Sequence, residues 1–147
     1  GFLGALLSLQ RDATAATGFV PSMDEILAIL LTLINAGTGT SYLVLEGALE
    51  ELVKNPLALK KAQDEVRKAV QGKHTVVEDD LIRMGYMKAV IKETLRLHPP
   101  TPLLIPRESM KSVQVRGYDI PNKTRVIINA WAIARDPDFW ESPEEFR

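Results

Sequence analysis

The feature that most constrains this chain is one unusually long predicted helix. Ser22 and Glu25 have the spacing of a capping box ahead of the apolar run ILAILLTLIN, and Asn55-Pro56 marks the next break. The stretch between them, Asp24 to Val53, would form a helix of about 45 Å. A helix of this length can cross a whole domain.

Further helices are expected on both sides of the long one. The pattern predicts a short apolar helix over Gly1–Gln10, a surface loop over Asp12–Gly18, a helix from Pro56 to near Gly72 with Asn55 as its N-cap, a short helix that begins at Glu78–Asp80, and a helix over Tyr86–Leu97 that ends at His98-Pro99-Pro100. The chain is thus mainly helical up to the prolines.

The pattern changes to short strands after the prolines. Val113 and Val115 alternate with polar residues, a turn follows at Pro121-Asn122-Lys123, and Thr124–Asn129 is rich in β-branched residues. These are candidate hairpin strands, and a short helix is expected over Trp131–Arg135. The predicted fold is mainly α with small β-sheets, in one domain that continues beyond the chain's ends.

Composition excludes several classes of function. The 147 residues carry 18 Lys and Arg against 19 Asp and Glu, so no excess of positive charge favours nucleic acid. There is no cysteine, and His74 and His98 lie too far apart for a local metal motif. The apolar stretch Ile26–Ile34 is shorter than the roughly 18 residues of a membrane span. We therefore expect no nucleic-acid partner, no metal held by these residues, and a buried helix at Ile26–Ile34.

The segment AGTGTS, residues 36–41, lies inside the long helix. Gly37 and Gly39 each cost roughly 1 kcal/mol relative to Ala in a helix interior, so they favour close approach by another group. The hydroxyls of Thr38, Thr40 and Ser41 can bond to the preceding carbonyls and deform the helix. A ligand beside this segment is one interpretation.

Two other interpretations of the segment remain open. The glycines can simply mark the place where two helices cross closely, which local sequence alone favours. A nucleotide-binding loop is the weaker alternative, because Tyr42 stands where the third glycine of a GxGxxG motif would be and no P-loop lysine follows.

Two further features carry charge. Glu93 and Arg96 are three residues apart on one helix face, and the local pattern favours a solvated salt bridge. The segment TPLLIPR, Thr101–Arg107, favours an extended connector with a solvated arginine, although Arg107 could also clamp an anionic ligand group.

The order of the motifs is more specific than any one of them. AGTGTS is followed by KETLRLHPP, PLLIPRES, GYDIPNKTRVIINAWAIARDP and WESPEEF. Together they closely resemble plant microsomal cytochromes P-450 over nearly the whole chain, and most closely the large group that oxidises specialised metabolites such as terpenoids and phenylpropanoids.

The resemblance implies a role for each motif. Ala36 and Gly37 would lie against a haem, and Thr40 beside bound dioxygen, where it helps deliver protons. Glu93 and Arg96 match the ExxR pair of the family, which is buried and supports the haem-binding core. Thr101, Leu103 and Leu104 would line the substrate pocket, and Arg107 would pair with a haem propionate.

The same resemblance implies the partners of a longer protein. These are a small lipophilic substrate, dioxygen and an NADPH-cytochrome reductase, on the cytosolic face of the endoplasmic reticulum membrane, with an N-terminal anchor that this chain does not contain. The expected activity is insertion of one oxygen atom into the substrate.

Two departures from the family pattern matter. Gly39 stands where an acidic residue usually precedes the threonine, and Gly47 stands where related plant sequences often have Trp. Gly39 cannot ionise, which puts proton relay in question. The haem-ligating cysteine is also absent, so the fragment alone is expected to be inactive. The alternative is a truncated, non-catalytic helical polypeptide.

Overall fold

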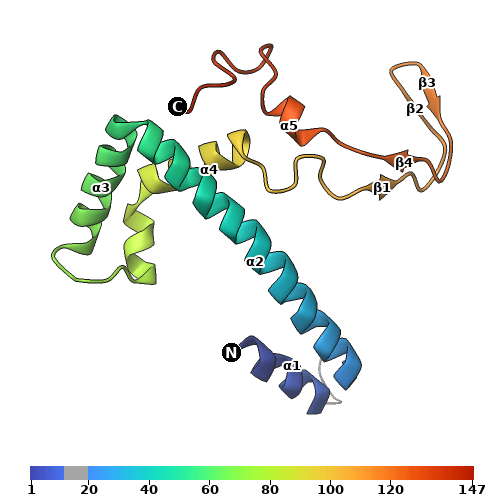
Figure 1. Cartoon of the computed structure of the whole chain (residues 1–147). Coiled ribbons are helices and arrows are strands. Elements are labelled where there is room, and N and C mark those ends of the chain that lie inside the picture. The colour runs from blue at the N-terminus through green and yellow to red at the C-terminus, as the bar shows by residue number, and fades with distance from the viewer. Residues whose placement is uncertain (12–19) are drawn as a thin grey trace. The chain divides into compact units, whose positions relative to one another are not determined.

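A computed structural model of the chain describes residues 1–11 and 20–147 (Figure 1). The predicted loop Asp12–Gly18 lies outside the described residues. The elements are α1 (Phe2–Arg11), α2 (Met23–Lys54), α3 (Pro56–Val70), the 3-10 helix η1 (Glu78–Arg83), α4 (Gly85–Leu97), β1 (Arg107–Glu108), β2 (Val113–Val115), β3 (Tyr118–Ile120), β4 (Arg125–Val126) and α5 (Ala130–Ile133). The prediction of a mainly α fold with small sheets is confirmed.

The first compact unit, Gly1–Tyr42, contains α1 and the first part of α2. The capping box at the start of α2 is confirmed, because the Glu25 amide donates to Ser22 Oγ at 3.2 Å and the Ser22 amide donates to Glu25 Oε2 at 2.7 Å. Of the stretch predicted to be a buried helix, only Ile26 is buried, and residues 31–43 are all exposed. That prediction is therefore wrong for this chain by itself.

The second compact unit, Leu43–Arg147, contains the last turns of α2 and all later elements. Its core is formed by Leu52 of α2, Ala62 of α3 and Val90 of α4, each less than a tenth exposed. Partly buried apolar side chains pack around this centre, namely Ala58, Leu59, Tyr86, Met87 and Phe146. Burial of these faces is what brings the three helices together.

The junction between α2 and α3 differs from the prediction in one contact. Pro56 is the first residue of α3, as expected, but Asn55 makes no side-chain cap to that helix. Its Nδ2 instead donates to the carbonyl of Glu51 at 2.9 Å. The Asn55 side chain thus adds a second hydrogen bond to the Glu51 carbonyl, which also accepts from the Asn55 amide at 3.0 Å.

The start of α4 is capped from a neighbouring helix. The Glu65 carboxylate of α3 accepts hydrogen bonds from the amides of Tyr86 and Met87, both at 2.8 Å. These two bonds hold the pKa of Glu65 below its ordinary value. They satisfy free amides of the first turn of α4 and fix that turn against α3.

The two sheets pair their strands differently from the predicted hairpin. β2 pairs with β3 in the register Val113↔Ile120, across a two-residue turn at Arg116 and Gly117, both with positive φ. β4 pairs with β1, with Arg107 opposite Val126. The Val113 and Thr124–Asn129 segments therefore belong to separate sheets.

Asp80 is buried in the segment that connects α3 to α4. Its side chain is 1% exposed, and it accepts hydrogen bonds from the Val77 amide at 3.1 Å, Lys73 Nζ at 3.3 Å and Arg83 Nη2 at 2.5 Å. The Val77 bond is the first cause of a lowered Asp80 pKa, and the two cations add to it.

Asp80→Asn is expected to lower stability at neutral pH and to reduce its acid dependence. Because the folded pKa is depressed, the stabilisation is present above the ordinary carboxyl pKa of 3.8 and is lost as pH falls through the folded value. Urea denaturation at neutral pH and at about pH 3 would measure this. The exposed neighbour Asp79→Asn is the control, and equal pH dependence of both variants would contradict the assignment.

Candidate functional site

The AGTGTS segment is α-helical throughout, within the unbroken helix α2. Thr40 Oγ1 donates to the carbonyl of Ala36 at 2.6 Å, one turn earlier. The predicted bond from a hydroxyl to a preceding carbonyl is therefore present at Thr40. Because the hydroxyl proton is engaged, the Thr40 oxygen is left to act as an acceptor.

The glycine pair does not mark a close crossing of helices within the described residues. A Cβ placed on Gly37 or Gly39 meets no atom within 4 Å, apart from its own helix and chain neighbours. The interpretation that local sequence favoured is therefore wrong for this part of the chain. The helix surface at Gly37 and Gly39 is open in the described part of the chain.

The close crossing lies further along α2, at Gly47. A Cβ at this position would lie 3.2 Å from Cβ of His98 and 3.3 Å from Cγ2 of Thr94, which is fully buried. Helix α4 thus approaches α2 where only glycine fits without adjustment. A bulky side chain such as Trp at position 47 would require a different spacing of these helices.

Glu93 and Arg96 of α4 form a buried pair. Their side chains are 14% and 7% exposed, and both oxygens of the carboxylate accept from the guanidinium, at 2.9 Å from Nε and 2.7 Å from Nη2. The local expectation of a solvated salt bridge is therefore wrong. A bidentate geometry of this kind is the strong form of the interaction.

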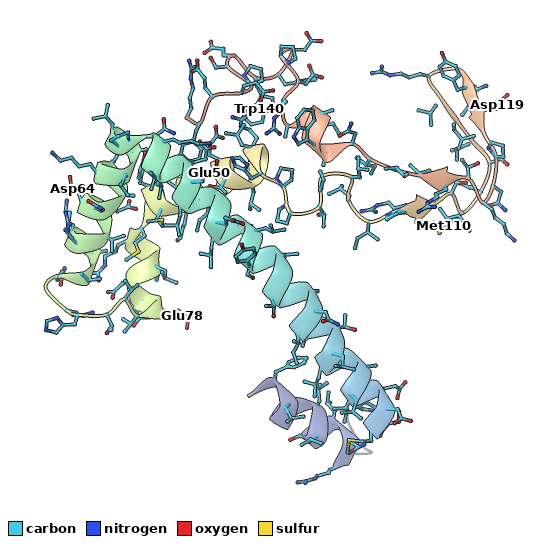
Figure 2. All side chains as sticks on the ribbon, viewed as in Figure 1. Glu50, Asp64, Glu78, Met110, Asp119 and Trp140 are labelled. Atoms are coloured by element: carbon cyan, nitrogen blue, oxygen red, sulfur yellow. The ribbon has the colours of Figure 1, made fainter. Side chains whose placement is uncertain are left out.

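The remaining guanidinium N–H groups of Arg96 bind the main chain of the C-terminal segment. Nη1 donates to the carbonyls of Ala134 and Pro143 at 2.9 and 2.7 Å, and Nη2 donates to that of Glu145 at 2.8 Å. The guanidinium also lies 4.7 Å from the ring centre of Trp140, which Figure 2 labels. All five donors of Arg96 are therefore used.

The pair is held in its ionised form. The hydrogen bonds from Arg96 lower the pKa of Glu93, and burial opposes this shift. The Arg147 amide also donates to Glu93 Oε1, at 3.0 Å. The arrangement positions main chain around a fixed charge pair, and all of the guanidinium donors are engaged in holding it.

Two long-range contacts were not predicted from the sequence. Arg135 Nη2 donates to the carbonyl of Leu97, and its guanidinium lies 4.4 Å from the ring centre of Trp131. Glu51 Oε1 lies 2.8 Å from His98 Nε2. No local signal identifies either contact, because the partners are 38 and 47 residues apart.

The segment after α4 forms a turn and then a short strand. The Leu104 amide donates to the carbonyl of Thr101 at 3.0 Å, and Leu104 adopts a φ of 53°, which is unusual for a residue other than glycine. Leu103 and Leu104 are exposed, at 48% and 38%. Arg107 is exposed on β1.

The predicted site residues fall in two groups. Ala36, Gly37, Gly39 and Thr40 belong to the first compact unit, and the remaining predicted residues belong to the second. Glu93 and Arg96 contact each other directly. Among residues 1–11 and 20–147, no group of three or more His, Asp or Glu side chains could hold a metal ion.

Helix α2 also has the length and composition of a membrane span. An 18-residue window within Met23–Lys54 reaches a mean hydropathy of 1.5, with 6% of the window buried. Core helices of soluble proteins pass the same test, so this observation alone does not assign a membrane segment.

Comparison with known proteins gives one consistent result. The family model described as cytochrome P-450 matches residues 2–147. The chain is 49% identical over 146 residues to norfluorocurarine oxidase of Strychnos sp, and 49% identical over 138 residues to costunolide synthase of Cichorium intybus. These matches cover 99% and 94% of this chain but only 28% of each relative.

Solved structures agree with the sequence matches. The chain superposes on a zebra fish cytochrome P-450, solved with abiraterone, with a TM-score of 0.85 and 29% identity. The match covers 99% of this chain and 36% of that one. The long helix, the paired α3 and α4, and the small sheets thus have counterparts in a known architecture.

Proposed function

Because the chain belongs to the cytochrome P-450 family, we propose that it is an internal segment of the single catalytic domain of a plant haem-dependent monooxygenase. The observation that carries the proposal is the match over residues 2–147 together with relatives whose names denote oxidation. The chain spans about 28% of those relatives, so the activity is that of a longer protein.

The residues present fit a haem in part. Ala36 and Gly37 offer a small-residue helix face with open space beside Gly37, where a flat macrocycle could pack. Arg107 is exposed and could pair with a propionate. No cysteine occurs in the chain, so a thiolate ligand for the haem would come from elsewhere in the longer protein. Haem with such a ligand would supply dioxygen binding and O–O cleavage.

Thr40 is proposed to move protons. Its oxygen can accept a hydrogen bond from water while its own proton is held by the Ala36 carbonyl at 2.6 Å. Delivery of a proton from Thr40 requires the hydroxyl to rotate away from that carbonyl. A water molecule would then donate a proton to the Thr40 oxygen. Thr40 would thus relay protons and not be their net source.

The other predicted residues are proposed to support and shape the site. Glu93 and Arg96 hold α4 against the main chain of the C-terminal segment, which supports a role in stabilising the haem-binding core. Thr101, Leu103 and Leu104 are proposed to line the substrate pocket. The exposed leucines and the positive φ of Leu104 support this role, because such backbone often occurs at ligand sites.

The proposed substrate is a small lipophilic metabolite. Dioxygen and electrons passed from NADPH by a cytochrome reductase would complete the reaction, with one oxygen atom inserted and the other reduced to water. We propose that the longer protein lies on the cytosolic face of the endoplasmic reticulum, held by an N-terminal anchor.

The test of this proposal has two steps. A transcript that continues in frame past Arg147 to a cysteine-containing loop is expected, and the reduced, carbon monoxide-bound protein should show the red-shifted band of a thiolate-ligated haem. A stop codon after Arg147 would leave the alternative of a non-catalytic helical polypeptide. A full-length protein without the band would contradict the monooxygenase assignment.

Gly39→Asp in the longer protein is expected to increase the product formed per NADPH consumed. A Cβ added at this position meets open space, so an aspartate fits, and its carboxylate could anchor and protonate a water chain next to Thr40. The expected gain is about twofold or more. Gly39→Asn is the matched control, because it has the same size but cannot ionise. Equal coupling in both variants would contradict a proton-transfer role.

A further inference from the structure

Glu51 and His98 form a contact that the proposed mechanism does not use. Glu51 lies near the end of α2 and is 9% exposed, and its Oε1 is 2.8 Å from Nε2 of His98, the residue that follows α4. Burying a carboxylate is costly unless it is paired. The pair therefore holds the end of α4 to α2 with a specific, directional contact.

Gly47 places a second contact one turn before the first. Residues 47 and 51 lie on the same face of α2, because they are four positions apart. The His98 side chain rests against Gly47, where an added Cβ would lie 3.2 Å from His98 Cβ. His98 is thus held at its Cβ by packing and at its ring by a hydrogen bond, and both holding residues are on α2.

The segment that follows His98 has a restricted backbone. Pro99 and Pro100 fix their own φ angles and restrict the residue before each of them. Pro102 lies within the Thr101–Leu104 turn, where the Leu104 amide donates to the Thr101 carbonyl, and the Pro102 carbonyl accepts from the Trp131 amide at 3.0 Å. The orientation of His98 therefore constrains the position of the Thr101–Leu104 turn, because the backbone between them has little conformational freedom.

We infer that Glu51 and His98 are a positioning pair that sets where Thr101, Leu103 and Leu104 present their side chains to substrate. This inference rests on the proposed function, in which that segment lines the substrate pocket. Glu51 acts through His98 and the two prolines and does not itself touch the substrate. Loss of the pair should change how large ligands fit while the haem remains bound.

Two azoles distinguish positioning from general structural damage. Imidazole binds haem iron without reaching far into a pocket, whereas clotrimazole binds the iron and also fills the pocket with three aromatic rings. In the longer protein, Glu51→Ala is expected to weaken clotrimazole about tenfold and to change imidazole binding by less than about twofold, as read from the haem absorbance shift.

Two further variants complete the experiment. Glu51→Gln keeps a group that can hydrogen-bond His98 and should restore clotrimazole binding. Glu50→Ala is the matched control, because the adjacent Glu50, labelled in Figure 2, has a side chain that is 52% exposed and pairs with Lys54 at 2.6 Å. It should leave both azoles unchanged.

His98→Leu is a second disruptive variant, since it breaks the pair from the other side and keeps a side chain beside Gly47. It should behave like Glu51→Ala. Equal changes for both azoles, unchanged clotrimazole binding, or loss of the haem band in both disruptive variants would overturn the inference. An unsubstituted protein without a thiolate haem band would overturn the proposed function, and the inference with it.

Discussion

Arg96→Lys in the longer protein is expected to abolish stable haem incorporation. Arg96 uses all five guanidinium donors, two of them on Glu93 and three on main-chain carbonyls up to 49 residues away. Lysine has one ammonium group with three donors and cannot reproduce the planar fork. Breaking a buried, fully bonded pair costs about 3 kcal/mol or more, a large part of a domain's stability.

The measurement is the carbon monoxide band per mole of purified protein. Arg67→Lys is a matched control, because Arg67 and Asp64 have the same three-residue spacing on a helix but are 72% and 61% exposed and 3.8 Å apart. Such an exposed pair contributes little. A haem band of normal height in Arg96→Lys would show that the buried network is dispensable.

The helices could be predicted from sequence because their boundaries are set by nearby residues. The Ser22–Glu25 capping box and the Asn55-Pro56 break placed the long helix at 24–53, and α2 spans Met23–Lys54. A cap or a proline acts within one turn, so its signal is visible in a short window of sequence. Asn55 shows the limit, since its side chain serves the preceding helix instead of the following one.

The predicted strand pairing was wrong because the turn that determines the pairing has a weak sequence signal. Val113–Val115 pairs with Tyr118–Ile120 across Arg116-Gly117, where both residues have positive φ. The predicted turn rested on the proline at 121 and not on the glycine at 117. A type I′ turn needs only that one glycine and a neighbouring residue that tolerates a positive φ.

The environment of Glu93 and Arg96 could not be derived from local pattern. The carbonyls that bind Arg96 belong to residues 38 to 49 positions later, in a segment with little regular structure. Only the resemblance to a family predicted that the pair is buried. The same holds for the Glu65 cap on α4, which depends on how two helices pack and not on either helix alone.

Thr40→Ala in the longer protein is expected to uncouple NADPH consumption from product formation. The substitution removes the only side-chain hydroxyl at this position, together with its 2.6 Å bond to the Ala36 carbonyl. If Thr40 relays protons, product per NADPH should fall about tenfold or more, and peroxide should rise correspondingly. Thr40→Ser keeps a hydroxyl and should retain most of the coupling.

Helix α2 contains its own control for this experiment. Thr32 Oγ1 donates to the carbonyl of Ala28 at 2.8 Å, the same bond that Thr40 makes two turns later. Thr32→Ala therefore removes an equivalent helical contact without removing the proposed relay, and coupling should not change. Similar uncoupling in both variants would assign the effect to the helix, whereas an effect at Thr40 alone would assign it to the hydroxyl. Because Gly39 provides no carboxylate, the Thr40 hydroxyl should be the more important proton path in this protein, and Gly39→Asp should partly restore coupling to Thr40→Ala.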